Sequence, residues 1–137
     1  MTRPTRFAAL LAALLAAAIA CTGALAAPKG KKGAANVVGV AMSRNLDQTI
    51  DLRVTIRSAD KGPEYFCDRF EILDPEGKVL HVERIAQPHV NEQPFSVSLT
   101  NLRVPEGLER VTFRARMRPD GASGTQRDVK LPAPRRK

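Results

Sequence analysis

The chain has 137 residues, a length that allows one globular domain of moderate size. It has a formal net charge of +8, two cysteines, no tryptophan and only 4% aromatic residues. So few aromatic side chains leave little for nucleic-acid bases to stack on, and we therefore expect no nucleic-acid partner.

The first 26 residues have the organisation of a secretory signal. Arg3 and Arg6 provide a basic start, residues 7–20 (FAALLAALLAAAIA) are all apolar, and residues 24–26 (ALA) match the pattern before a signal-peptidase cut. The apolar run is shorter than the ~20 residues of a membrane span. We therefore predict export to the periplasm or the medium; an uncleaved N-terminal anchor is the alternative.

Cys21 offers a second way of processing. Residues 18–21 (AIAC) resemble the lipobox of bacterial lipoproteins, in which the cysteine is lipidated and becomes the first residue. We prefer cleavage after Ala26, with lipid anchoring through Cys21 as the alternative. In both cases Cys67 is the only thiol of the exported domain, and its strand-like surroundings predict burial rather than intermolecular pairing.

The positive charge is concentrated at the ends of the chain. Residues 27–35 form a flexible basic linker, residues 133–137 form a basic tail, and each contains three Lys or Arg residues. Residues 36–134 contain 14 basic and 14 acidic side chains, so the folded part is neutral. Basic ends favour weak contact with anionic surfaces, although we prefer to interpret them as solubilising.

From residue 36 to 132 apolar and polar residues alternate with period two between turn residues, which is typical of half-buried strands. This pattern predicts an all-β, immunoglobulin- or fibronectin-III-like sandwich of about seven antiparallel strands. Gly39 and Asp68 interrupt the alternation: Gly39 predicts a bulge or an edge strand, and Asp68 predicts a bulge or a loop edge. The predicted strands are residues 37–42, 49–57, 65–73, 79–85, 95–99, 111–117 and 127–131.

Residues 86–99 (AQPHVNEQPFSVSL) contain the most unusual side chains of this β domain. His89 lies between Pro88 and Val90, and Glu92 follows three residues later. The two side chains could bind a ligand, but they lie in a link between two strands whose prolines fix its path. We favour a structural role, in which they bond the backbone of a rigid loop.

Motifs for catalysis are missing from the sequence. It contains no Gly-x-Ser-x-Gly elbow, no phosphate loop and no His-Glu-x-x-His pattern. Exported β-sandwiches do carry copper, but Met117 continues an apolar strand face and His81 lies in a strand. We therefore predict no enzyme, no cofactor and no bound metal. The soft or borderline ligands considered are Met42, Cys67, His81, His89 and Met117.

Arg114, Arg116 and Arg118 alternate along one predicted strand, so they share one outer face. Three guanidinium groups in a row could hold a surface that bears carboxylates or phosphates. The alternative, which we favour, is pairing with Glu71 and Asp128 on the neighbouring strands.

Four segments of the chain resemble a family of small exported bacterial β-sandwich proteins of uncharacterised function. They are residues 57–70 (RSADKGPEYFCDRF), 72–79 (ILDPEGKV), 87–99 (QPHVNEQPFSVSL) and 104–115 (VPEGLERVTFRA). The resemblance implies a secreted β domain and no particular activity. Ser58, Gln87, Arg116 and Asp120 stand where the family has histidines. The family motif His-Pro-His-Val-x-Glu-Gln-Pro-Phe is matched at His89, Glu92, Gln93, Pro94 and Phe95.

We therefore expect an exported, non-catalytic β-sandwich module with a binding or structural role in the cell envelope. Its partner would be an envelope protein or polymer. The alternative is a periplasmic protein that binds a metal or small ligand through His89, with Glu92 or Cys67. The sequence leaves the identity of the partner and the oligomeric state open.

Overall fold

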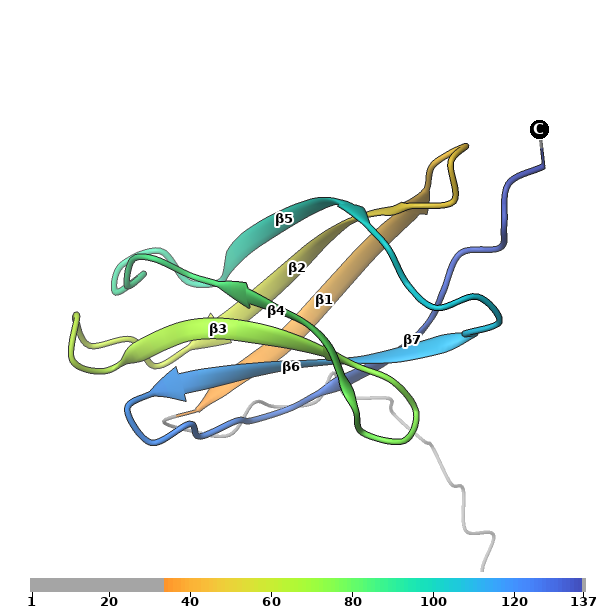
Figure 1. Cartoon of the computed structure of the whole chain (residues 1–137). Helices are drawn as coiled ribbons and strands as arrows, with labels where there is room; N and C mark the ends of the chain where they lie inside the picture. The colour runs from red at the N-terminus through yellow and green to blue at the C-terminus, as the bar shows by residue number, and fades with distance from the viewer. Residues whose placement is uncertain (1–33, 137) are drawn as a thin grey trace, which may run out of the picture.

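A computed structural model of the chain describes residues 34–136. The predicted signal, Cys21 and nearly all of the basic linker lie outside this range. The described residues form seven strands and no helix, and therefore contain no helix that could span a membrane (Figure 1). The strands are β1 (Ala35–Arg44), β2 (Ile50–Ser58), β3 (Phe66–Leu73), β4 (Val79–Arg84), β5 (Phe95–Leu102), β6 (Arg110–Arg118) and β7 (Arg127–Lys130).

The strands pair antiparallel in two sheets, ordered β1-β2-β5 and β4-β3-β6-β7. This arrangement confirms the all-β, seven-stranded prediction, and the two sheets pack as a sandwich (Figure 1). In constant-type immunoglobulin domains the fourth strand belongs to the sheet of the first, second and fifth. Here β4 pairs with β3 instead, and the immunoglobulin- or fibronectin-like type stays a prediction.

The core lies between the sheets and follows the predicted alternation. β2 and β6 bury every second side chain, as half-buried strands do. Met117 is fully buried, which confirms that it belongs to the core. The largest fully buried side chains are Phe70, Phe113, Ile50, Ile56, Ile72, Met117, Val37, Val54, Val111 and Cys67.

Both predicted bulges occur, and the one at Asp68 changes which side chains face inward. The register of β3 against β6 shifts between Cys67 and Arg69. Cys67 lies opposite the buried Met117, and residues directly opposite share a face. Strict alternation along residues 65–73 would place Cys67 on the same face as Arg69, but the extra residue reverses the parity before it. The prediction that Cys67 is buried is confirmed.

The start of β1 joins the two sheets. Its first residues pair with β2 and also with the link between β6 and β7. The Gly124 N–H donates to the Ala35 carbonyl at 2.8 Å, and the Val37 N–H donates to the Thr125 carbonyl at 2.9 Å. The Thr125 N–H donates to Oδ1 of the buried Asn36 at 2.8 Å. These bonds close the sandwich along this side.

We predict that Gly124→Ala destabilises the protein by about 1–3 kcal/mol, the usual cost of overpacking. A Cβ at this position would lie 2.1 Å from Asn36 Oδ1 and 2.9 Å from the Ala35 carbonyl oxygen. Urea unfolding measures the effect. The matched control is Gly39→Ala, whose Cβ meets only Thr55 at an ordinary 3.6 Å and should leave the unfolding midpoint nearly unchanged. Equal midpoints for the two variants would contradict this prediction.

Candidate functional site

The link between β4 and β5, residues 85–94, is held by a buried carboxylate that lies far away in the sequence. Asp60 follows β2 and is only 8% exposed. Its Oδ1 accepts hydrogen bonds from Ser58 Oγ at 2.6 Å and from the Cys67 N–H at 2.9 Å. Its Oδ2 accepts the His89 N–H at 2.8 Å. One side chain therefore ties together the end of β2, the start of β3 and the link.

Gln93 completes this attachment with both ends of its amide. Its Oε1 accepts the Ser58 N–H at 2.9 Å. Its Nε2 donates to the His89 carbonyl at 2.7 Å and to Ser58 Oγ at 3.3 Å. The backbone of His89 is thus bonded on both sides, at its N–H and at its carbonyl.

The imidazole ring of His89 packs flat on the ring of Phe95, the first residue of β5. The ring centroids are 3.9 Å apart and the planes differ by 5°. Nδ1 is buried and has no hydrogen-bond partner among the described residues. The ring therefore acts mainly as a packing element, as such aromatic pairs do.

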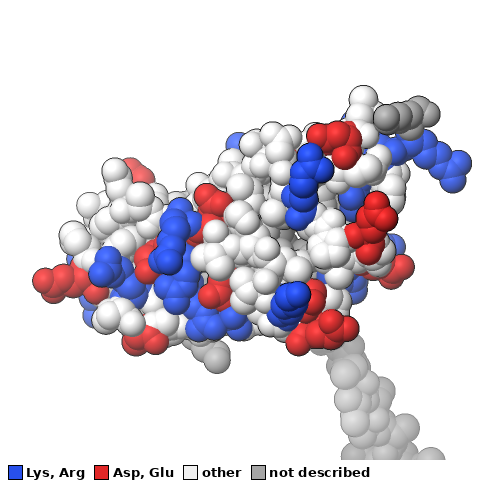
Figure 2. Space-filling model, in the orientation of Figure 1, with Lys and Arg blue, Asp and Glu red and all other residues white. Residues whose placement is uncertain are grey.

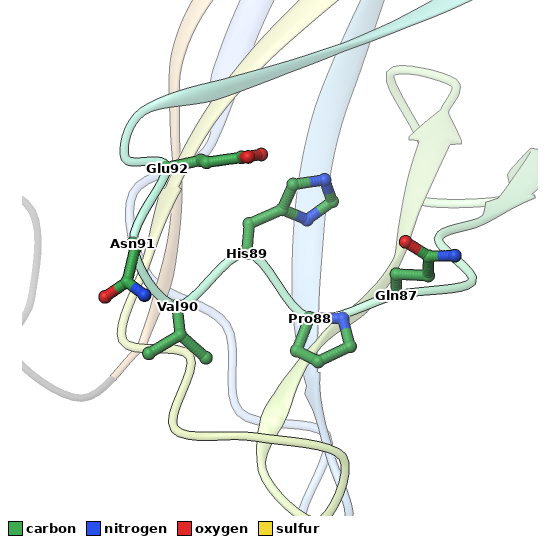
Figure 3. Close-up of a pocket in the computed structure, with 6 residues that line it drawn as sticks. All are labelled: Gln87, Pro88, His89, Val90, Asn91 and Glu92. Atoms are coloured by element: carbon green, nitrogen blue, oxygen red, sulfur yellow. The ribbon is translucent and has the colours of Figure 1, made fainter.

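An open pocket of about 280 Å³ lies against this link and is lined by residues 87–92. Figure 3 shows the side chains of His89 and Glu92 extending to the same side of the link. Glu92 is exposed. Within the described part of the chain no hydrogen bond joins His89 to Glu92 or to the Cys67 thiol. The expected bonds from these two side chains to the loop backbone are likewise not found among the described residues, because the His89 ring packs on Phe95 and Glu92 extends into solvent.

Cys67 is unsuited to a role as nucleophile or ligand. Burial raises the pKa of its thiol to about 12. The sulfur donates a weak hydrogen bond to the Arg69 carbonyl, with 3.6 Å between Sγ and the oxygen. Since the reactive species of cysteine is the thiolate, this thiol is inert at neutral pH.

The other candidate ligands are dispersed. His81 Nε2 lies 2.9 Å from Glu83 Oε2 on the edge strand β4. Met42 is partly buried against the core. No group of three or more His, Cys, Asp or Glu side chains that could hold a metal ion occurs in residues 34–136.

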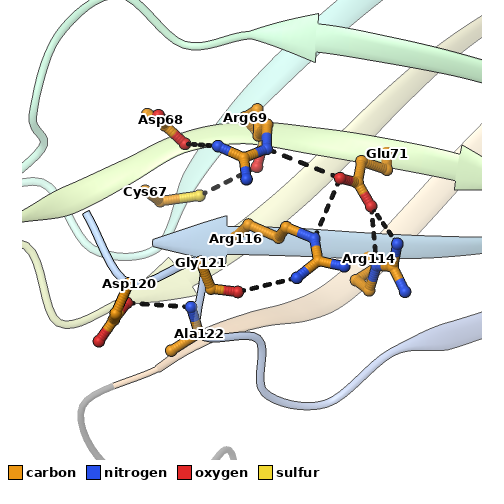
Figure 4. Close-up of polar contacts among 9 residues, drawn as sticks. All are labelled: Cys67, Asp68, Arg69, Glu71, Arg114, Arg116, Asp120, Gly121 and Ala122. Carbon is orange, nitrogen blue, oxygen red and sulfur yellow. Dashed lines mark hydrogen bonds and ion pairs between the residues drawn. The ribbon is translucent and has the colours of Figure 1, made fainter. Parts of the chain in front are cut away.

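The predicted arginine stripe lies on the outer face of β6, where one acid organises it (Figure 4). Glu71 on β3 is 7% exposed. Arg114 donates through Nε at 2.8 Å and through Nη2 to Glu71 Oε2, and Arg116 Nε donates to Oε1 at 3.0 Å. Arg69 Nε lies 3.6 Å from the same Oε1. Burial opposes the charged carboxylate, but the bonds from Arg114 and Arg116 outweigh it and lower the pKa of Glu71.

The remaining parts of the stripe differ from the expected pairing. Asp128 pairs with Arg110, at 3.2 Å between carboxylate and guanidinium, and with none of the three stripe arginines. The guanidinium of Arg118 lies over the ring of Phe66, 5.7 Å from its centroid. The favoured pairing therefore occurs for Arg114 and Arg116 with Glu71 but not for Arg118.

Sequence reasoning missed Asp60 and Arg69. Asp60 lies in a turn-like segment (DKGP), where most aspartates face solvent, and no local pattern marks its contact with His89, 29 residues away. Arg69 could have been found from the strand register, since it lies opposite Arg116.

Comparison of the chain with family models, curated proteins and solved structures found no match. The family resemblance given above therefore stays a prediction.

We predict that Asp60→Asn destabilises the protein by about 3 kcal/mol, since bonds to a charged acceptor contribute roughly 1.5–3 kcal/mol each. The new amide nitrogen would face one of the N–H or O–H donors. Urea unfolding measures the loss, and hydrogen exchange should show faster exchange at His89 than in the core of β6. Asp128→Asn, at an exposed ion pair, should change stability by less than about 1 kcal/mol. Equal effects of both substitutions would refute a structural role for Asp60.

We also predict an acid-dependent contribution from Glu71. In the folded state the pKa of Glu71 is lowered from its ordinary value of 4.5, so the carboxylate binds a proton more readily in the unfolded chain. The contribution is therefore complete above about pH 4.5 and is lost as the pH falls through the lower folded pKa. Glu71→Gln should lower stability at neutral pH by roughly 3 kcal/mol and flatten the acid limb of the stability–pH profile. A profile parallel to that of the unmodified protein would contradict this.

Proposed function

We propose that the protein is an exported, non-catalytic β-sandwich module with a binding or structural role in the cell envelope. One observation carries this proposal: the side chains with the most reactive groups, a carboxylate, a thiol and an imidazole, hold the fold together or pack within it. The Asp60 carboxylate receives three hydrogen bonds within the domain. Cys67 is buried with its pKa raised to about 12, and His89 is stacked on Phe95.

These contacts favour a rigid loop over a reaction centre. A general base or nucleophile must reach the proton or atom on which it acts. Cys67 has no exposed surface and no base bonded to its thiol within the described residues. The His89 backbone is bonded to Asp60 and Gln93, so the path of the loop is fixed by the domain.

Export is the part of the proposal that rests on the sequence alone. Residues 1–26 have the composition of a secretory signal, and Cys21 offers lipid anchoring as the alternative. Processing at either site would leave a basic linker ahead of Ala35, the first residue of β1.

A second candidate function is the binding of a metal or small ligand in the periplasm. It is favoured by Nδ1 of His89, which is buried without a partner among the described residues, and by the open pocket beside it. Glu92 extends to the same side of the link and could contribute an oxygen ligand (Figure 3).

Metal uptake separates the two functions. We expect the processed protein, incubated with Cu(II) or Zn(II) and desalted, to retain no stoichiometric metal by elemental analysis. One equivalent that is lost in His89→Ala and retained in His81→Ala would establish the second function. His89→Phe is the matched variant, because it keeps a ring on Phe95 and removes both ring nitrogens. A folded His89→Phe protein shows that loss of metal reflects loss of the ligand.

A further inference from the structure

The outer face of the four-stranded sheet concentrates guanidinium groups. Arg84 on β4 lies opposite Arg69 on β3, and Arg69 lies opposite Arg116 on β6. Figure 2 shows basic side chains gathered, with acidic ones between them, over the part of the surface formed by β3, β4 and β6. We call this surface the arginine face and define it as Arg69, Arg84, Arg114, Arg116 and Arg118.

The arginine face has more positive charge than its own acids neutralise. Among the described residues, Glu71 and Asp68 are the carboxylates that pair with its five arginines. Arg84 and Arg118 are exposed and have no carboxylate within salt-bridge distance in the described chain. Residues 36–134 are neutral as a whole, so the excess of three positive charges is local to this face.

Three arginines of the arginine face are partly buried. The side chains of Arg69, Arg114 and Arg116 are 25%, 20% and 28% exposed. Like charges on adjacent strands repel, and partly buried cations need compensating negative charge. An external anion would supply the compensation that the chain lacks.

The guanidinium groups also converge. Arg116 Nη1 and Arg69 Nη2 lie 3.8 Å and 3.9 Å from one point, the position that a Cβ on Gly121 would occupy (Figure 4). Arg116 Nη1 donates to the Gly121 carbonyl, and Arg69 Nη1 donates to Asp68, so each group is fixed in position with further N–H groups available. Fixed guanidinium forks match the oxygens of phosphate.

We propose that the arginine face binds phosphate groups of an anionic ligand. A phosphate monoester offers about −1.5 to −2 of charge and three acceptor oxygens, which suits an excess of three positive charges better than one more carboxylate does. The proposal deepens the proposed function, on which it rests, by naming the chemistry of the ligand. An exported protein meets this chemistry in lipid headgroups and in soluble phosphates.

The test uses the natively processed protein in buffer with EDTA. Its binding is measured by co-sedimentation with vesicles of phosphatidylglycerol and phosphatidylcholine in equal parts, and by calorimetric titration with inorganic pyrophosphate. Arg84→Gln/Arg118→Gln removes two exposed arginines of the arginine face and leaves the Glu71 contacts intact. Arg53→Gln/Arg57→Gln is the matched control, with two exposed arginines on β2 in the other sheet.

We expect the arginine-face variant to lose affinity by about tenfold or more and the control to stay within about twofold. Binding to vesicles alone assigns lipid headgroups, and binding to pyrophosphate assigns soluble phosphates; either result supports the proposal. No binding to either probe, or equal losses in both variants, overturns it. Equal losses would indicate net charge rather than a site. Because EDTA removes metal, failure here is distinct from failure of the metal-uptake test.

Discussion

One end of the sandwich, the end that holds the β4–β5 link, depends on the hydrogen bonds of the Asp60 carboxylate. An ionised carboxylate is an acceptor only, and its buried oxygens must meet donors. Here the donors come from β2, from β3 and from the link that crosses between the sheets. Hydrogen bonds to a charged group in a low-dielectric site are among the stronger ones in proteins. The route from β4 in one sheet to β5 in the other is therefore fixed by a residue that belongs to neither strand.

Glu71 is a second buried carboxylate with several donors, but it lies on the outer face of the four-stranded sheet and its donors are charged. Asp60 meets uncharged donors, so its negative charge is shared among dipoles. Glu71 meets three guanidinium groups and is outnumbered by them. The hydrogen bonds of Asp60 are satisfied within the domain, whereas the single negative charge of Glu71 does not neutralise the positive charge of its three arginine partners. Asp60 therefore accounts for part of the fold, whereas the arginines around Glu71 support the proposed binding of an anion.

The strand pattern was predictable because period-two alternation is a property of each strand by itself. β2 and β6 show it most clearly, and their buried faces lie where the sequence predicts. The bulges were also predictable, since Gly39 and Asp68 break the alternation locally. The burial of Cys67 was predicted from its strand-like surroundings, but the alternation alone could not place it inward, because a bulge reverses the parity and the alternation does not show at which residue. Asp60 was beyond local reasoning altogether, since its partner His89 becomes a neighbour only when the sheets pack.

The same limit explains why His89 resembled a ligand. A histidine three residues before an acid, between prolines, has the composition of a binding loop. In the folded chain its N–H donates to Asp60, its carbonyl accepts from Gln93 and its ring stacks on Phe95. Two of these partners, Gln93 and Phe95, lie in the same short motif, so the motif specifies its own packing. The described carboxylates leave part of the positive charge of the arginine face unpaired, whereas the loop around His89 is satisfied by its own contacts, and the proposed phosphate binding is therefore placed on that face.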